Sequence, residues 1–361
     1  MKTSQELLFE LLLVSTGARK TLSHKYTDKE WEDAYNLAED QAILGVLMDA
    51  LEKIQVHGAD FMPSKMLLLQ WIGMGQMVEA ETKKMTEAGN TVVKYFHKHG
   101  FACQILKGSA VGRYYPHPSW RSSGDIDIWL DGGRKKIYDF ARAFDKDGKL
   151  YGVNYHHIHF HLLDDVHIEV HIWPSFLSSP LRNLRLHKFC NLHRPTMEST
   201  MPSLAFDRVF ILLHCYRHIC GHGVGLRQIM DYFYVLKQGF TEEERADAVY
   251  WIKKLGMGKF ASGLMWVLKQ YFGLEEEYLL MEGDEKEGRF IMKEVLLTGN
   301  MGHGDTRNWG SIKTPMSRFF MNLKRNFYMA KHCPHEALWM PFFSLWLYAW
   351  RLSKGLLRDR E

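Results

Sequence analysis

The stretch from Gly124 to Leu130 constrains the fold of this chain more than any other segment. Its sequence, Gly-Asp-Ile-Asp-Ile-Trp-Leu, places Asp125 and Asp127 one residue apart inside an apolar run. In a β-strand alternate side chains share a face, so both carboxylates point the same way. Two carboxylates side by side repel each other and are costly to remove from water. We therefore expect a cation between them, and Mg²⁺ is suitable because it binds one or two carboxylates together with substrate phosphates.

Length and charge are those of an ordinary globular protein. The 361 residues are enough for two or three packed units, and 24% of them are charged. The formal net charge of +4 is small for this length, so a long nucleic acid is not an expected partner. The sequence has no uncharged apolar run of about 18 residues, so a membrane-spanning helix is not expected.

The cysteines and the N-terminus predict a cytoplasmic protein. The five cysteines are scattered, odd in number and without a CxxC pair, which indicates a reducing compartment and no disulfide framework. Glu6 and Glu10 interrupt the first apolar stretch, so a signal peptide is not expected.

The residue pattern predicts a small α/β core between two helical regions. Residues 1–100 and 179–361 show mostly helical periodicity, with capping boxes at 27–30 and 241–244. Residues 101–178 instead carry short apolar or alternating runs, which predict strands at 102–106, 125–130, 156–163 and 166–173. We therefore expect an α+β fold, with a central domain over 101–178 and large helical regions on either side of it in sequence.

The two later strands repeat the polar-face pattern of the first. Their apolar residues alternate with histidines and one acid, namely His157, His159, His161, His167, Glu169 and His171. If the apolar side of the sheet packs on helices, all these polar groups gather on the other side. Asp125, Asp127 and Glu169 then form a carboxylate triad around a metal, which suits phosphoryl or nucleotidyl transfer.

Such chemistry also requires a phosphate-binding turn, and Lys107-Gly108-Ser109 is the best candidate. It lies at a predicted strand-to-helix junction, where glycine allows close backbone approach and a helix N-terminus favours an anion. Lys107 and Arg121 would add positive charge to the same ligand.

Taken together, these motifs resemble the uncharacterised bacterial nucleotidyltransferase family, within the polymerase-beta-type nucleotidyltransferase superfamily. The resemblance extends from about Trp31 to about Gly302. The segments that carry it are Leu106-Lys107-Gly108, Tyr115-Pro116, Arg121, Asp125-Ile126-Asp127-Ile128, His167-Ile168-Glu169-Val170-His171, and Leu226-Arg227-Gln228 with Asp231.

The resemblance implies a small mixed sheet with helices, and a nucleoside triphosphate and Mg²⁺ or Mn²⁺ as ligands. By this resemblance Gly108 and Ser109 match the phosphate-binding turn, and Asp125, Asp127 and Glu169 match the metal-binding acids. We therefore predict a metal-dependent transfer of a nucleoside monophosphate from a triphosphate to a hydroxyl-bearing acceptor. The acceptor itself, a small molecule, a sugar or a protein, is left open.

For several side chains the sequence allows two interpretations. Arg227 would reach the triphosphate, or would form an ion pair with Asp231 one helical turn later. His167 and His171 flank the third acid and would support the metal ligands or contact substrate. The histidines of 156–163 would bind a transition metal or form a solvated strand face.

Two alternative functions also stay open. His167 and Glu169, together with a distant histidine such as His218, would make an iron site of two histidines and one carboxylate. The chain would otherwise be a non-catalytic member of the fold that binds a nucleotide or a protein.

The C-terminal segment has its own pattern. Residues 337–350 are apolar and aromatic, and the basic residues that follow are Arg351, Lys354, Arg358 and Arg360. Such a segment would lie on the inner face of a membrane, or would pack on the protein's own core or on a second subunit. Unless it packs on the protein's own core, we expect 337–360 to be a contact surface for a membrane or a second subunit.

Overall fold

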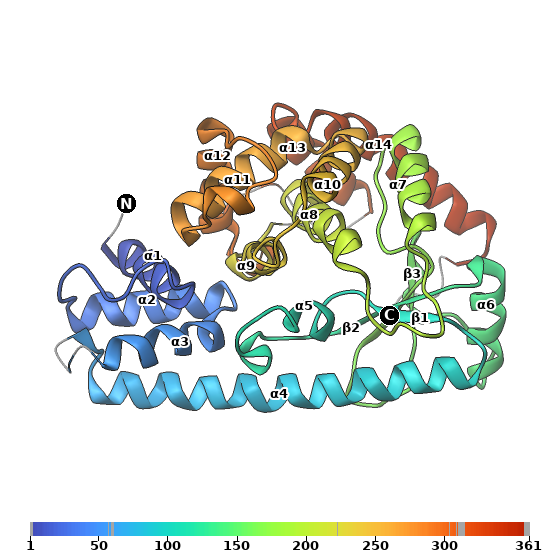
Figure 1. The fold of residues 1–361 in the computed structure, drawn as a ribbon. Coiled ribbons are helices and arrows are strands. Elements are labelled where there is room, and N and C mark those ends of the chain that lie inside the picture. The colour runs from blue at the N-terminus through green and yellow to red at the C-terminus, as the bar shows by residue number, and fades with distance from the viewer. Residues whose placement is uncertain are drawn as a thin grey trace.

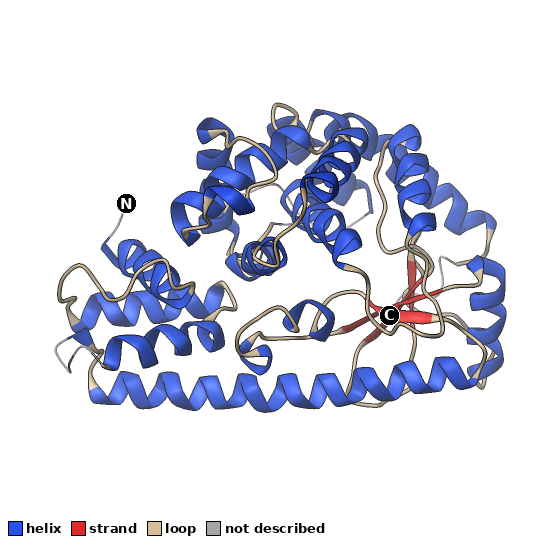
Figure 2. Cartoon of the chain, viewed as in Figure 1, coloured by secondary structure: helices blue, strands red, loops and turns tan. Residues whose placement is uncertain are grey.

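The computed structural model describes residues 3–56, 58, 61–221, 223–302, 304–307, 309 and 315–356. Helices make up most of the chain, and one small sheet lies between the long helix α4 and the C-terminal helices (Figure 1; Figure 2). The predicted α+β class is therefore confirmed, whereas the three domain boundaries stay a prediction. One apolar core runs from Leu7 and Trp31 in the N-terminal helices to Phe260 and Phe272 in the C-terminal ones.

The described part of the N-terminal region contains four α-helices: α1 (Thr3–Ser15), α2 (Asp28–Asp40), α3 (Leu44–Gln55) and α4 (Lys65–Lys98). The predicted capping box at the start of α2 is confirmed, because Thr27 and Glu30 cap each other's backbone N–H groups. The helix expected over 80–99 is the second half of α4, whose 34 residues extend about 50 Å along one side of the molecule (Figure 1).

The sheet is mixed and has four short strands: β1 (Cys103–Ile105), β2 (Ile126–Leu130), β3 (His157–His159) and β4 (Ile168–His171). Their order is β1-β2-β4-β3, with β2 and β4 parallel and the two outer pairs antiparallel. Each strand is shorter than predicted, so Asp125 and His167 lie directly before their strands, and His161 lies beyond β3.

The apolar side of the sheet packs on helices, as predicted from the alternation. Ile128 and Val170 are buried in one cluster with Phe96 of α4 and Ile137 of α6 (Gly133–Phe144). Burying apolar surface contributes roughly 25 cal/mol per Å², so this face fixes the register of the strands. The other face of the sheet, which carries Asp127 and Glu169, therefore turns away from α4.

The remaining helices follow the sheet, apart from the single turn α5 (Ser109–Gly112) and the 3-10 turn η2 (Pro118–Trp120) between β1 and β2. They are α7 (Pro180–Leu192), α8 (Leu204–Gly221), α9 (Leu226–Leu236), α10 (Glu242–Leu255), α11 (Gly258–Phe272), α12 (Glu285–Thr298), α13 (Pro315–Met329) and α14 (Pro334–Ser353), with short turns η3 (Glu276–Tyr278) and η4 (Asn300–Gly302). The second predicted capping box, at Thr241 and Glu244, is confirmed at the start of α10.

A disulfide joins the end of α8 to the start of α14. Cys220 and Cys333 are 113 residues apart in sequence, and their Cα atoms are 6.5 Å apart. One bond is not a disulfide framework, but it differs from the free cysteines that are usual in the reducing compartment we expected. The other three, Cys103, Cys190 and Cys215, are free thiols and buried.

Helix α14 packs on the protein through one face and leaves an apolar face exposed. Phe343 stacks on Phe176 with ring centroids 4.8 Å apart, whereas Leu338, Phe342 and Leu345 are 58–61% exposed. No helix among the described residues is long and apolar enough to cross a membrane. The end of the predicted contact segment, residues 357–360 with Arg358 and Arg360, lies outside the described residues.

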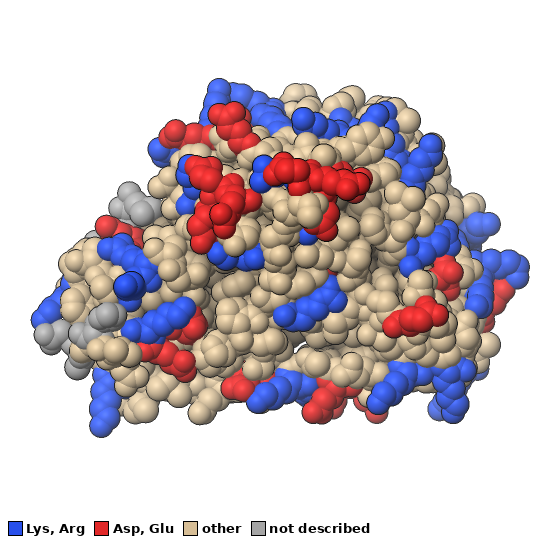
Figure 3. All heavy atoms as spheres, viewed as in Figure 1, with Lys and Arg blue, Asp and Glu red and all other residues tan. Residues whose placement is uncertain are grey.

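Acidic and basic side chains are interspersed on the face of the molecule shown in Figure 3. Lysine and arginine side chains are scattered there among Asp and Glu and form no continuous stripe. A track of positive charge is the usual mark of a surface that binds the nucleic-acid backbone. This face therefore does not present such a surface.

His187 of α7 gives a testable pH dependence of stability. Its ring stacks on Trp173 with centroids 3.8 Å apart, and burial, with a smaller effect of Arg134, lowers its pKa to about 4. Between about pH 6.5 and the folded pKa, the unfolded chain binds a proton that the folded chain does not. The contribution of the neutral His187 ring to the free energy of unfolding is therefore complete above about pH 6.5 and is lost as pH falls toward 4.

We expect His187→Phe, which keeps the aromatic stack, to lose less stability than wild type between pH 7 and pH 5. Urea unfolding of both proteins at the two pH values measures this difference, and the other buried histidines contribute equally to each. An identical pH dependence in both proteins would contradict the assignment.

Candidate active site

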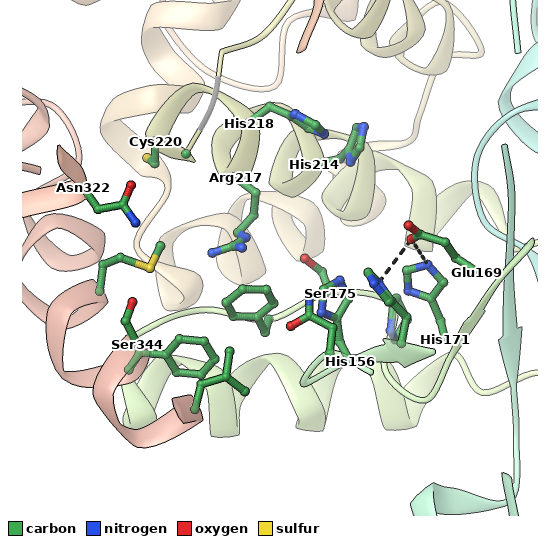
Figure 4. A pocket seen from close by; sticks show the side chains of 18 of the residues that line it. His156, Glu169, His171, Ser175, His214, Arg217, His218, Cys220, Asn322 and Ser344 are labelled. Carbon is green, nitrogen blue, oxygen red and sulfur yellow. Dashed lines mark ion pairs between the residues drawn. The ribbon is translucent and has the colours of Figure 1, made fainter. Parts of the chain in front are cut away.

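The polar face of the sheet lines a cavity of about 580 Å³. Lys107, Asp125 and Glu169 lie on its sheet wall, α8 contributes His214 and Arg217, and α13 and α14 close the opposite side (Figure 4). Ligand pockets of proteins commonly have volumes of about 300–1,000 Å³. The cavity is therefore large enough for a small molecule.

Asp127 and Glu169 are neighbours because β2 and β4 are parallel and place them in register. The Asp127 side chain is almost fully buried, with Lys107 Nζ 2.8 Å from its Oδ2 and His171 Nε2 2.8 Å from its Oδ1. Burial would raise the pKa of Asp127, but Lys107 and His171 outweigh it and hold that pKa well below its usual range. Asp127 is thus an ionised carboxylate at neutral pH.

Glu169 and His171 form a second charged pair beside Asp127. Glu169 Oε2 lies 3.1 Å from His157 Nδ1 and 3.4 Å from His171 Nε2. Burial opposes both charges, yet the two carboxylates raise the pKa of His171 to about 9 and contact with His171 lowers that of Glu169 to about 2. His171 is therefore a cation that links the two acids.

Asp125 stands at the edge of this group. It precedes β2, is exposed, and lines the same cavity as Glu169. Repulsion from the Asp127 carboxylate is the largest effect that raises the pKa of Asp125. Within the described part of the chain, ligand atoms of Asp127, Glu169 and His171 all lie within 4.8 Å of one another, and Asp125 is not in that group.

The chemistry of these donors fits a divalent cation. Asp125 and Glu169 on the cavity wall, with Asp127 buried beside Glu169, offer the oxygen ligands that Mg²⁺ and Mn²⁺ prefer. The repulsion felt by Asp125 is of the kind that a bound cation removes. Lys107 and His171 already neutralise part of the negative charge of these acids and keep them ionised. A bound divalent ion would neutralise more of that charge.

Lys107 and Gly108 lie between β1 and the single turn α5, and Ser109 is the first residue of α5, which is the strand-to-helix junction expected from the sequence. Gly108 has φ +55° and ψ −120°, a conformation that is unfavourable for residues with a side chain. A Cβ atom there would lie 2.9 Å from Ser123 Oγ. Gly108 and Ser109 line a small recess that also contains Asp125, and only Lys107 reaches the main cavity.

We expect Gly108→Ala to lower the free energy of unfolding by about 1–3 kcal/mol, because the backbone must adopt a strained conformation or shift. Gly124→Ala is the matched control, since its Cβ meets nothing within 4 Å. That control is expected to change stability by less than about 0.5 kcal/mol. Urea unfolding measures both, and equal effects would contradict the role of the Gly108 conformation.

Arg121 is placed in a buried ion pair and does not line the main cavity. Its Nε and Nη2 donate to the two carboxylate oxygens of Asp231 at 2.8 and 2.7 Å, and Tyr115 Oη donates to the same carboxylate. Asp231 therefore pairs with Arg121, whereas Arg227 donates through Nη1 to the carbonyl of Ser122 at 3.2 Å. The intrahelical Arg227–Asp231 pair, one of the two sequence interpretations, is not the arrangement found.

The proposed iron site of His167, Glu169 and His218 is not assembled. His218 lies on α8, across the cavity from β4 (Figure 4). Neither His167 nor His218 belongs to a three-residue ligand group among the described residues. Glu169 instead shares such groups with His157, His159 and His171.

Four charged or titratable cavity residues were not predicted to belong to the site. His214 and Arg217 come from α8, Arg325 from α13 and Arg351 from α14. On α8, polar residues at positions 214, 217 and 218 follow helical spacing after the apolar run 209–213, which is a detectable signal for a polar face. For Arg325 and Arg351 the sequence carries no such signal, because tertiary packing alone brings α13 and α14 to the sheet.

Comparison with known proteins gives one match. The sequence model of a family described as uncharacterised nucleotidyltransferase matches residues 27–273. This range contains every predicted site residue and ends before α13 and α14. No curated protein and no solved structure matches the chain.

Proposed function

Because the chain belongs to the uncharacterised nucleotidyltransferase family, we propose that it transfers a nucleoside monophosphate from a nucleoside triphosphate to a hydroxyl group of a small acceptor. The observation that carries this proposal is the pairing of Asp127 and Glu169 in register on parallel strands. Asp125 and Lys107 lie beside them on the wall of a cavity of about 580 Å³. Acids and one lysine at the edge of a cavity suit a metal-bound triphosphate.

Asp125, Asp127 and Glu169 would hold Mg²⁺ or Mn²⁺. Such an ion bridges phosphate oxygens and neutralises the charge that develops on them. His171 would keep Asp127 and Glu169 oriented through its contacts with both carboxylates. Glu169 would also help to remove the proton of the acceptor hydroxyl, directly or through the metal ligand shell.

Lys107 would bind the triphosphate as a point charge, next to the turn of Gly108 and Ser109. Its ammonium group already lies among the carboxylates, where burial lowers its pKa but Asp127 and Asp125 raise it more strongly. Lys107 is therefore charged when a phosphate approaches. Arg227 and Arg121 interact electrostatically with Asp125 but do not line the main cavity, and Arg121 would act by holding its loop to α9 through Asp231.

The wall opposite the acids would bind the acceptor. It presents the guanidinium groups of Arg217, Arg325 and Arg351, which outnumber the two acids paired with them, Glu336 at 3.6 Å from Arg217 and Asp305 at 4.0 Å from Arg325. Cations attract anions and repel amines across a cavity of low dielectric. We propose an acceptor that carries a phosphate or carboxylate, and not a polyamine or a long nucleic acid.

Release of pyrophosphate tests this proposal. The full chain is incubated with each nucleoside triphosphate, Mg²⁺ or Mn²⁺, and paired acceptors that differ only in a phosphate, such as a sugar and its phosphate ester. We expect metal-dependent release with an anionic acceptor. Absence of release across the panel, with triphosphate still bound, would support the non-catalytic alternative.

We further propose that the protein acts in the cytoplasm, where triphosphates and Mg²⁺ are supplied, and that the exposed face of α14 contacts a membrane or a second subunit. The exposed Leu338, Phe342 and Leu345 support a contact surface. The disulfide of Cys220 and Cys333 is the observation against a reducing compartment. Cosedimentation with anionic vesicles, compared with the mass of the protein in solution, distinguishes the two surfaces.

A further inference from the structure

Nucleotidyl transfer by carboxylates gives a role to His171 but leaves the other histidines around it without one. Six imidazoles lie within sixteen residues of the sheet region: His156, His157, His159, His161, His167 and His171. Such a density of imidazoles next to a carboxylate is a common feature of transition-metal sites.

One set of three has the geometry of a metal site. His157 and His159 are two residues apart on β3 and share a strand face, and β4 places Glu169 in register with His159. One ligand atom of each residue lies within 4.8 Å of the other two. His157 Nδ1 is already 3.1 Å from Glu169 Oε2.

The other sets that contain histidine are less suitable because they require His171. Its Nε2 bonds to Asp127 Oδ1 at 2.8 Å, and its Nδ1 contacts the carbonyl oxygen of Trp173 at 3.3 Å. A metal on either nitrogen would break one of these contacts. In contrast, the only close polar partner of His157 Nδ1 in the described structure is Glu169, which would be its fellow ligand.

We propose that His157, His159 and Glu169 bind a divalent transition-metal ion, at a second site that shares Glu169 with the proposed Mg²⁺ site and takes its other ligands from β3. Two imidazoles and one carboxylate bind zinc or iron and leave positions open, whereas Mg²⁺ prefers oxygen ligands alone. His157 and Glu169 line the main cavity, so the ion would have a path from solvent. Glu169 has two oxygens and would connect this site to the acids of β2.

Cobalt provides a direct test because Co²⁺ bound to imidazole absorbs visible light. The full chain, first treated with a chelator, is titrated with Co²⁺ and followed by absorbance. We expect saturation at one equivalent, displacement by Zn²⁺, and no displacement by a large excess of Mg²⁺. Absence of saturable binding would overturn the proposal.

Variants distinguish this site from adventitious binding. We expect His159→Gln and His157→Gln each to weaken Co²⁺ binding by roughly 100-fold or more, since removal of outer partners alone costs about 10–100-fold. His161→Gln is the matched control, because His161 is exposed and lies outside the group. Equal loss in all three variants would mean scattered surface imidazoles and would overturn the assignment.

One variant distinguishes a failure of this proposal from a failure of the proposed function. Asp125→Asn is expected to retain Co²⁺ binding, because Asp125 is not a ligand of this site, and to lose metal-dependent triphosphate binding. Thermal unfolding of each variant confirms that it is folded, and Zn²⁺ should raise the melting temperature of wild type but not of His159→Gln.

Discussion

Asp125→Asn is expected to lower the rate of pyrophosphate release by about 10²–10³-fold, because a metal ion supplies several kcal/mol of transition-state stabilisation and each ~1.4 kcal/mol is tenfold in rate. The substitution keeps the shape of the side chain and removes one charged oxygen ligand. The measurement is the initial rate with Mg²⁺ and the best anionic acceptor of the panel.

The same substitution is expected to leave stability unchanged or higher. Repulsion from Asp127 raises the pKa of Asp125, so the ionised carboxylate is unfavourable in the folded protein without metal. Asp131→Asn is the matched control, since Asp131 directly follows β2 but pairs with Arg194 at the surface. If Asp131→Asn lost as much activity as Asp125→Asn, or Asp125→Asn retained the wild-type rate, the metal assignment would be wrong.

Asp231→Leu is expected to lower the free energy of unfolding by about 3–5 kcal/mol, because it leaves the buried Arg121 guanidinium without its carboxylate. Arg121 and Asp231 are both almost fully buried, and Tyr115 loses its acceptor as well. Urea unfolding at neutral pH measures the loss.

The double variant Arg121→Met/Asp231→Leu is its control. Replacing both charges by apolar side chains removes the uncompensated cation, so most of the stability should return. Asp131→Asn, which breaks an exposed pair, should cost less than about 1 kcal/mol. A loss below about 1 kcal/mol for Asp231→Leu alone would show that Arg121 does not depend on this pair, and would favour a role at the triphosphate instead.

Local sequence patterns predicted much of the sheet and its polar face. Alternation in 125–130 and 166–173 was enough to place Asp127 and Glu169 on one face, because the period of a strand is two residues. The same rule overestimated strand length, and β3 has only three residues where eight were predicted over 156–163. Strand ends depend on available partners, and sequence alternation does not reveal these.

Local sequence patterns did not predict which residues distant in the chain pair with each other. The spacing of Arg227 and Asp231 suggested a helical ion pair, but Asp231 bonds to Arg121, 110 residues earlier in the chain. A buried guanidinium with its fixed geometry outweighs a neighbour one turn away, since it can bind both carboxylate oxygens. The disulfide of Cys220 and Cys333 is a second example, because α8 and α14 become neighbours only in the folded chain.

The cavity wall opposite the acids depends on tertiary packing even more strongly. Arg325 and Arg351 lie on helices beyond the matched family segment, and each donates to a backbone carbonyl of a distant segment, at Ile219 and Val153. Helices α13 and α14 therefore supply a part of the cavity wall that lies outside the matched family segment.

The most direct test of the central proposal is equilibrium binding of a nonhydrolysable nucleoside triphosphate to the full chain, with and without Mg²⁺, by calorimetry. It needs no acceptor, so it isolates the carboxylate site. We predict that Mg²⁺ strengthens binding to wild type and to Asp131→Asn, and that this gain is lost in Asp125→Asn and in Asp127→Asn. Equal, Mg²⁺-independent binding to all four proteins would contradict the account.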